Sequence, residues 1–153
     1  MRWSRFAEDV PELATLCRVR LEEPGVALLG TLRRDGAPRI DPVEPNFSGG
    51  ELVLGAMRGT AKAYALRRDP RCVLHSTISG PDIGEADVKL SGHVEPSMVQ
   101  AGWWAERPPE EVEVYAFQVE EAIAIEWNLA ASSMVVRRWT PSSGERVRQR
   151  TYP

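Results

Sequence analysis

The sequence has few of the residues on which most catalytic and metal-binding sites depend. It holds two histidines, His75 and His93, and two cysteines, Cys17 and Cys72, and it has neither a Gly-x-Ser-x-Gly elbow nor a His-Glu-x-x-His helix. Disulfide frameworks and zinc sites need cysteines that are closely spaced or repeated, and these two are not. We therefore expect no metal site, no hydrolase machinery and two reduced cysteines that behave as small hydrophobic residues. No candidate catalytic residue emerges.

The sequence also lacks a long apolar run and an excess of positive charge. No stretch approaches the roughly 20 apolar residues that cross a bilayer, and the first five residues lead into charged sequence. The net charge is -3, from 19 basic and 22 acidic residues, so no overall positive field attracts nucleic acid or an anionic membrane. The arginines between residues 137 and 150 have no interleaved aromatic residues. We expect a cytoplasmic protein with neither nucleic acid nor membrane as a partner.

What remains is an ordinary globular composition with a strand-rich pattern. The 153 residues, 42% of them hydrophobic, suit a single domain over residues 1–153. Apolar spacing predicts a helix over 8–23, with Asp9 as its cap and Pro11 in its first turn. Shorter runs bounded by glycine and proline predict strands over 26–32, 37–43, 51–56, 71–78, 87–95, 114–119, 122–127 and 133–140. Short helices are expected over 58–69 and from residue 96, a flexible loop over 79–84, and a free tail or a partner-bound arm over 140–153. This order predicts an α+β, mainly antiparallel β-barrel.

The most informative stretch is residues 52–62, where a predicted strand runs through glycine into a helix. The start of a helix presents free backbone N–H groups and a positive dipole end, which together suit a phosphate. Arg58, Thr60 and Lys62 would add two charges and a hydroxyl at the same place, and Lys62 is one of only two lysines in the chain. The alternative interpretation is that Thr60 only caps the helix while both cations are solvated. The spacing alone leaves both interpretations open.

Five short motifs in one order carry a family resemblance. They occupy residues 36–40 (GAPRI), 50–52 (GEL), 59–62 (GTAK), 66–71 (LRRDPR) and 87–92 (DVKLSG). In this order and spacing the chain resembles the pyridoxamine 5'-phosphate oxidase-like FMN-binding split-barrel proteins. It is especially similar to their small actinobacterial members, whose arginine-rich and lysine-poor composition it shares.

The resemblance implies an antiparallel six-stranded split β-barrel with short peripheral helices. It also implies a homodimer that binds FMN, or alternatively the deazaflavin F420, in a groove between subunits. The family's phosphate motif falls on Thr60 and Lys62, and the backbone of residues 41–43 would lie against the flavin ring. The implied cofactor-binding set is Arg39, Asp41, Pro42, Val43, Ala56, Met57, Arg58, Thr60 and Lys62. Because the cofactor carries the chemistry, the protein needs no acid, base or nucleophile of its own.

Departures from the family pattern argue against one of the family's activities, the oxidation of pyridoxamine phosphate. Pyridoxamine phosphate oxidases carry an arginine inside the second strand and end with an Arg-x-His motif, whereas Arg39 lies earlier in the strand and residues 148–150 hold no histidine. We therefore expect no classical pyridoxamine phosphate oxidase. Two functions stay open: an FMN- or F420-dependent oxidoreductase acting on a small organic substrate, or a non-catalytic protein that binds flavin, F420 or haem.

A homodimer is expected on a second ground, the number of tryptophans. A small split barrel leaves an apolar groove open when it is alone, and one small core does not readily bury four large indoles. The tryptophans in question are Trp103, Trp104, Trp127 and Trp139. The alternative is that all four pack within one chain.

Overall fold

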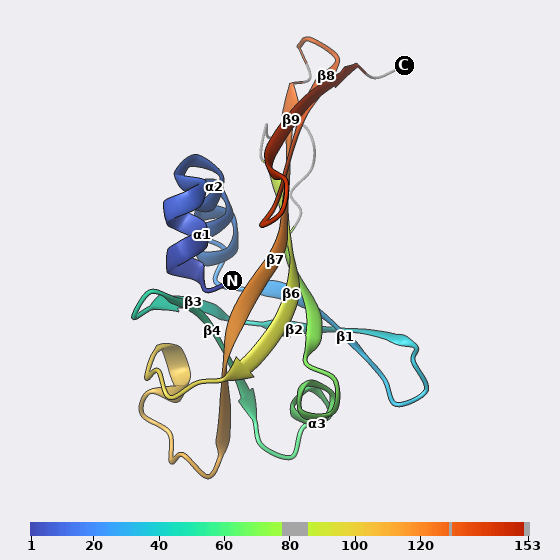
Figure 1. Cartoon of the computed structure of the whole chain (residues 1–153). Coiled ribbons are helices and arrows are strands. Elements are labelled where there is room, and N and C mark those ends of the chain that lie inside the picture. Colours follow the sequence, from blue (N-terminus) through green and yellow to red (C-terminus); the bar gives the residue numbers. More distant parts are fainter. Residues whose placement is uncertain (78–85, 129, 152–153) are drawn as a thin grey trace.

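The structure, a computed structural model, describes residues 1–77, 86–128 and 130–151 (Figure 1). The helices are α1 (Trp3–Asp9), α2 (Pro11–Glu22), α3 (Ala61–Arg68) and the short 3-10 turn η2 (Gly102–Trp104). The strands are β1 (Ala27–Leu32), β2 (Pro38–Val43), β3 (Pro45–Ser48), β4 (Glu51–Met57), β5 (Arg71–Ser76), β6 (Asp87–Pro96), β7 (Val112–Asn128), β8 (Ser133–Thr140) and β9 (Gly144–Thr151). The loop expected over 79–84 lies outside the described residues. In the described part of the chain, no helix has the length and apolar character that a membrane crossing needs.

All the strand pairs are antiparallel, and six strands form the body of the barrel. Along the sheet these six follow the order β2-β1-β5-β6-β7-β4, with β3 added outside β4 and the β8–β9 hairpin attached to β7. The two ends of the six-strand path, β2 and β4, approach each other, but no ladder joins them among the described residues. The barrel is therefore split at this seam, and the predicted six-stranded split barrel of the mainly β, α+β class is confirmed.

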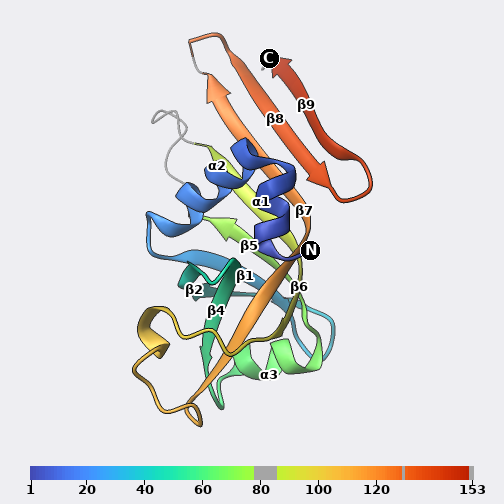
Figure 2. The ribbon, with the colours of Figure 1, turned by 60° about the vertical axis from the view of Figure 1, so that its left-hand side comes forward.

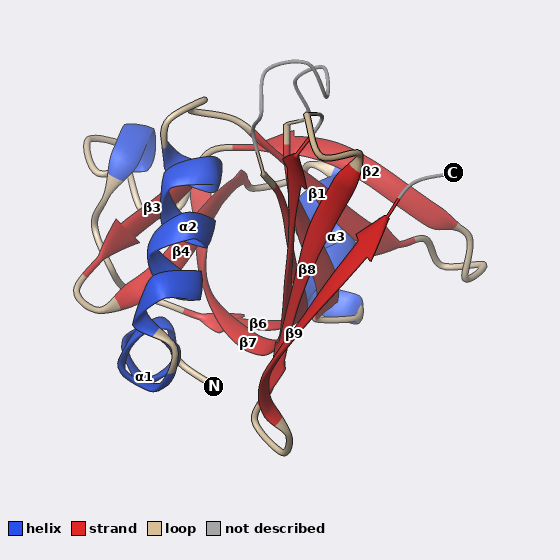
Figure 3. Ribbon diagram, turned by 90° about the horizontal axis from the view of Figure 1, so that it is seen from above, coloured by secondary structure: helices blue, strands red, loops and turns tan. Residues whose placement is uncertain are grey.

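The helices cover opposite ends of the barrel and close its core. Helices α1 and α2 lie beside the upper part of the sheet, and α3 lies at the lower end (Figures 1 and 2). Seen from above, α1 and α2 occupy one side of the molecule, and β8 and β9 the other (Figure 3). Leu13, Cys17 and Leu21 of α2 are completely buried, in the same core as Leu29 and Leu74 of the sheet. This burial explains why the helix repeats its apolar residues on one face.

The cysteines behave as expected from their isolation in the sequence. Cys17 and Cys72 are both buried and free. Burial raises the pKa of each thiol to about 12, because the thiolate loses its hydration inside the protein. Both side chains are therefore neutral, packed thiols at physiological pH.

The N-terminal helix expected over 8–23 is wrong in its extent, since the structure has two helices that meet at Val10. Val10 precedes α2 with φ -139° and no side-chain cap, so Asp9 does not cap the helix, while Pro11 does occupy its first turn. Asp9 instead ends α1 and accepts a hydrogen bond from Trp139 Nε1 at 2.7 Å. The apolar spacing correctly predicts which face of α2 is buried. The role of the Asp9 carboxylate, however, is decided by its tertiary contact with Trp139 of β8.

The C-terminal third is more continuous than the sequence suggests. The strands expected over 114–119 and 122–127 are one strand, β7, because Glu120 forms a bulge rather than a break. The helix expected from residue 96 is reduced to η2, and β3 was not anticipated. Residues 144–151 form β9, paired with β8, so the free-tail alternative is wrong.

The tryptophan argument for a dimer also fails in part. Trp104 is 1% exposed and Trp139 is completely buried within one chain. Trp139 packs edge-on against Phe6, with ring centroids 4.7 Å apart. These two indoles need no second subunit, and only Trp103 and Trp127 are left half-buried.

The hydrogen bond between Asp9 and the buried Trp139 indole should be a measurable part of stability. Asp9→Ala would leave a buried N–H group without an acceptor, which costs about 1–3 kcal/mol of the free energy of unfolding. Asp9→Asn keeps an acceptor and should cost clearly less. Urea unfolding followed by tryptophan fluorescence measures the difference. Glu8→Ala, which removes only an exposed ion pair to Arg5, should change stability by less than about 1 kcal/mol. Equal losses for Asp9→Ala and Asp9→Asn would contradict this role.

Candidate functional site

The candidate site lies where the seam of the barrel brings β2 against the start of α3. Lys62 is the second residue of α3, and its Nζ donates a hydrogen bond to the Pro42 backbone oxygen of β2 at 2.8 Å. Twenty residues separate the two in sequence. The two halves of the predicted set, residues 39–43 and 56–62, thus meet in space through Lys62.

The start of α3 is built by Thr60. The Thr60 hydroxyl accepts a hydrogen bond from the Ala63 N–H at 3.3 Å and donates one to the Met57 carbonyl at 2.7 Å, so it is a genuine helix cap. The N–H groups of Ala61 and Lys62 have no carbonyl partner within the helix, as in the first turn of any helix. The capping interpretation of Thr60 is therefore correct, and it leaves backbone donors beside the Lys62 ammonium.

Beside Lys62, Arg39 and Asp41 form a bidentate ion pair along β2. Arg39 Nε donates to Asp41 Oδ2 at 2.6 Å, and its Nη2 donates to Oδ1 at 2.8 Å. The hydrogen bonds from Arg39, helped by the Lys62 charge, hold the pKa of the Asp41 carboxyl below its usual range. The Arg39 guanidinium is thus already matched by a carboxylate, and Lys62 is the cation with no carboxylate bound to it among the described residues.

Partial burial changes the pKa of the Lys62 ammonium. Burial lowers its pKa, and the Arg39 charge adds to that effect, while the nearby carboxylates of Asp41 and Glu44 oppose it. An ammonium that has lost part of its hydration gains more from an anion than a fully solvated one does. Lys62 is therefore the residue of this cluster best suited to hold an anionic group.

The remaining predicted residues divide between the site and other surroundings. Val43 and Ala56 are buried, with 3% and 1% exposure, so only their backbones are available to a ligand, and Met57 is 38% exposed at the end of β4. Arg58 is exposed and lines a separate pocket with Tyr115, so the structure does not bring its side chain together with Lys62. The sequence predicts Arg58 beside Lys62 because both lie close to the start of α3, but closeness in the sequence does not decide the direction of a side chain in the preceding turn.

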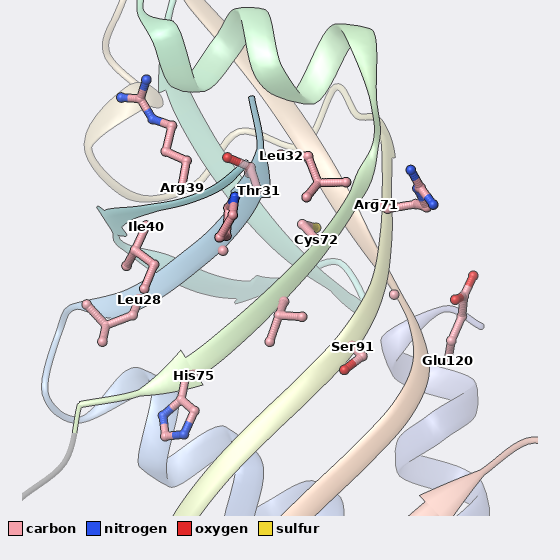
Figure 4. Close-up of a pocket in the computed structure, with 14 residues that line it drawn as sticks. Leu28, Thr31, Leu32, Arg39, Ile40, Arg71, Cys72, His75, Ser91 and Glu120 are labelled. Carbon is pink, nitrogen blue, oxygen red and sulfur yellow. The ribbon is translucent and has the colours of Figure 1, made fainter. Parts of the chain in front are cut away.

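Next to this cluster the outer face of the sheet carries a groove of about 660 Å³. Alternate residues of β1, β2 and β5 point outward there, among them Leu28, Ile40 and His75 (Figure 4). Leu28 is 38% exposed and Ile40 is 69% exposed, which is unusual for large apolar side chains. The Arg39 side chain extends away from Leu28 and His75, so apolar groups dominate this part of the groove (Figure 4).

The groove residues were not identified as a site from the sequence. The signal was present in β1, where a run that is apolar on both faces predicts a strand covered on both sides. The structure covers one face with its own core and leaves Leu28 on the other. Val73 and His75, two residues apart on β5, both line the groove.

His75 has a defined orientation in the groove. Its Nδ1 lies 2.7 Å from the Ser76 carbonyl oxygen, a contact that requires Nδ1 to carry the proton and donate it. Its Nε2 has no hydrogen-bond partner among the described residues, and in the neutral ring it is an acceptor. The side chain therefore offers one lone pair from a half-buried position.

Comparisons with known proteins show which solved structures share this fold. Neither the comparison with protein-family models nor that with curated proteins finds a match. Among solved structures, the chain is similar to a pyridoxamine 5'-phosphate oxidase-related, FMN-binding protein from Nostoc punctiforme (TM-score 0.59, 10% identity, covering 97% of this chain and 95% of the other). It is also similar to an F420 reductase (TM-score 0.54, 19% identity, 69% and 94%) and to a haem-binding protein from Mycobacterium smegmatis (TM-score 0.55, 13% identity, 90% and 88%). The six-strand path, the split between β2 and β4 and these likenesses together show that the chain has the split-barrel fold of the pyridoxamine 5'-phosphate oxidase-like proteins.

Proposed function

We propose that the protein is an oxidoreductase that binds FMN, or alternatively F420, with the cofactor phosphate at the start of α3. The observation that carries the proposal is the contact of Lys62 with the Pro42 carbonyl, because it joins the phosphate-binding motif of residues 59–62 to the strand expected to lie against the flavin ring. The substrate is a small organic molecule. Bound flavin or deazaflavin would supply the hydride chemistry.

The residues at the seam fit a phosphate group. Lys62 supplies a partly desolvated ammonium, and the first N–H groups of α3 supply neutral donors at the positive end of the helix dipole. The pairing of Arg39 with Asp41 keeps the local charge moderate, so Lys62 is the dominant electrostatic contact. Because Thr60 uses its hydroxyl on its own helix, its part is to hold the first turn of α3 in place.

The outer face of the sheet fits the ring of the cofactor. The groove begins at β2 and continues over apolar side chains of β1 and β5, where water is easily displaced. The exposed Pro42 has no backbone N–H, so this part of β2 does not need a further strand to complete a ladder. A flat aromatic ring can therefore lie against β2 without leaving a buried donor unpaired.

A non-catalytic binding protein is the second candidate, and His75 favours haem as its ligand. A histidine whose Nδ1 donates to a carbonyl presents Nε2 in the form that binds iron, and the groove around it is apolar. The likeness to a haem-binding split barrel supports the same alternative. Absorption spectra separate the candidates: a flavin or deazaflavin band that bleaches with reductant and recovers with an acceptor supports the oxidoreductase, whereas a Soret band lost in His75→Ala supports haem binding.

We further propose that a second copy of the chain covers the open sheet face. Leu28 and Ile40 are exposed on this face and adjoin the groove, so a second copy would bury them and enclose the cofactor. A face-to-face contact of this kind would cover the apolar surface and the open side of the groove together.

Loss of the Lys62 ammonium should weaken cofactor binding more than it weakens folding. A hydrogen bond to a charged group is worth about 1.5–3 kcal/mol, so Lys62→Ala should reduce the affinity for FMN or F420 by about tenfold to a hundredfold. Fluorescence titration of apo-protein with each cofactor measures the loss and also distinguishes the two cofactors. Arg5→Ala removes a cation from the far helix α1 and should leave affinity unchanged. Unaltered binding by Lys62→Ala, or no binding of either cofactor by the parent, contradicts the phosphate site.

Cofactor affinity should also depend on pH through Lys62. The ammonium binds phosphate only while it is protonated, so affinity is full below its pKa and falls as the pH rises through it. Since burial lowers this pKa from the ordinary lysine value of 10.5, the fall should begin below pH 10.5. Binding constants measured between pH 7 and 11 give the profile. Lys62→Arg keeps the charge throughout and should remove this fall, while any ionisation of the cofactor itself persists in both proteins.

The second copy can be tested directly at Ile40. Light scattering after size-exclusion chromatography should give twice the 17.0 kDa of one chain for the parent protein. Ile40→Glu places a charge on the exposed face and should yield a folded monomer, whereas Val19→Glu on α2 should stay dimeric. A monomeric parent at micromolar concentration would overturn the proposal.

A further inference from the structure

The free side of strand β9 offers backbone groups to another chain. In the described part of the chain β9 pairs with β8 and with no other strand. It is the outer strand of a hairpin that extends above the barrel, so neither the barrel nor a helix lies along this side (Figures 1 and 2). Every second residue of an antiparallel strand points its N–H and C=O groups to the same side. With eight residues, β9 is long enough to pair with a further strand of about five or six residues.

Three arginines stand along this strand. Arg146, Arg148 and Arg150 occupy alternate positions, so their side chains point to one face and follow each other at about 7 Å. We call these three residues the arginine row. All of them are exposed, and none has an ion-pair or hydrogen-bond partner for its side chain among the described residues.

The arginine row lies on the face of the hairpin that is turned away from α2. Arg146 is directly opposite Arg138 in the β8–β9 ladder, so the two side chains share a face. Arg137, the preceding residue, points to the other face and contacts Glu12 of α2 at 3.3 Å. Helix α2 therefore leaves the arginine row open.

The arginines of β8 are matched by carboxylates, whereas the arginine row is not. Arg137 Nε donates to Glu145 Oε1 at 2.6 Å, and Arg138 Nε donates to Glu121 Oε1 at 2.5 Å. These ion pairs neutralise the inner strand of the hairpin. The arginine row leaves its outer strand positive, although the whole chain has a net charge of -3.

We propose that the free side of β9 binds an extended acidic segment of another protein as an added antiparallel strand. Backbone hydrogen bonds to β9 would hold the segment, and its carboxylates would make charge-assisted contacts with the arginine row. The alternation of β9 specifies the pattern of the segment. Acidic residues would occupy alternate positions, with an apolar residue opposite Val147, which is 59% exposed, and a polar residue opposite Gln149.

The combination of backbone groups and charge favours a peptide over other anions. A nucleic acid or an anionic lipid surface would meet the arginine row but would leave the backbone groups of β9 without partners. A neutral strand would pair with the backbone but would leave the arginines without carboxylates. An acidic strand matches both features.

This surface is separate from the flavin site. Strands β6, β7 and β8 lie between β9 and β5, the last strand with apolar groove residues, and α3 with Lys62 lies at the lower end of the barrel (Figure 1). Binding at β9 is therefore independent of the cofactor that the protein holds.

Fluorescence anisotropy with the full chain and labelled peptides tests the proposal. The probe is the heptapeptide Gly-Glu-Thr-Glu-Val-Glu-Gly, whose glutamates would face Arg150, Arg148 and Arg146 in an antiparallel pair. It should bind, and more weakly as the salt concentration rises. The analogue with glutamine in place of glutamate should bind about tenfold more weakly or worse. The analogue N-methylated at its inner residues keeps the charges but loses the backbone donors, and it should be weakened as much.

A charge reversal in the arginine row supplies the matched variant. Arg148→Glu places a carboxylate in the middle of the row and should lower the affinity for the glutamate peptide by about tenfold or more. Arg34→Glu makes the same change of net charge at the exposed turn between β1 and β2, and it should bind the peptide like the parent. Circular dichroism and thermal unfolding show whether each variant is folded.

Three outcomes would overturn the proposal. The first is no binding of the glutamate peptide at millimolar concentration. The second is equal binding of the N-methylated analogue, or tighter binding of an oligothymidylate of the same charge, which would make the arginine row a plain polyanion surface. The third is an equal loss of affinity in folded Arg148→Glu and Arg34→Glu, because the peptide would then respond to net charge alone.

Discussion

The arrangement of the strands depends on a close approach of the β6 and β7 backbones inside the sheet. At Gly92 the strand β6 comes so near to β7 that a Cβ would lie 1.9 Å from the Gln118 carbonyl oxygen. Only glycine fits there, and the bulge at this point lets β7 bend while it stays paired on both sides of Glu120. Because β7 also pairs with β4 and β8, this bend places the α3 end of the barrel and the C-terminal hairpin relative to each other.

The short helix α3 carries two cations in different surroundings, Lys62 near its start and Arg67 near its end. At its start, α3 offers free N–H groups and the half-buried Lys62, an environment that favours an anion. Near its end, Arg67 forms an ion pair with the mostly buried Glu113, at 3.5 Å. The eight residues of α3 therefore carry one cation without a bound carboxylate, Lys62, and one that is paired with a carboxylate, Arg67, since neighbouring positions on a helix point in different directions.

The sequence predicts most of this fold because its strongest signals are local. Glycine and proline mark the ends of β1, β4 and α3, and Thr60 caps α3 as its spacing indicates. The errors lie where a distant contact decides the outcome. Asp9 looks like a cap until Trp139 is brought to it, and Glu120 looks like the end of a strand until Gly92 accommodates the bulge. Local periodicity contains neither contact.

The residues of the candidate site also divide into those that the sequence predicts and those that depend on tertiary contacts. Residues 59–62 could be found because a strand running into a capped helix is visible in the sequence, and the resemblance joins them to residues 39–43. Arg58 was misplaced because the direction of a side chain in a tight turn depends on the turn's conformation. The hydrogen bond between Tyr115 and Glu113 leaves almost no trace in the sequence, since two residues on one face of a strand are common and their burial depends on tertiary packing.

The last strand of the sheet constrains how the protein can associate with copies of itself. Within the described part of the chain strand β9 pairs only with β8, so it is an edge whose other side has unpaired backbone groups to which another strand can add. Arg146, Arg148 and Arg150 alternate along it and are exposed on one face. In an antiparallel pair of two such edges, arginine would stand opposite arginine, and the repulsion disfavours continuous ribbons of molecules. The edge is protected against fibre growth by its own charges, so the sheet can keep an open end without becoming a template for aggregation.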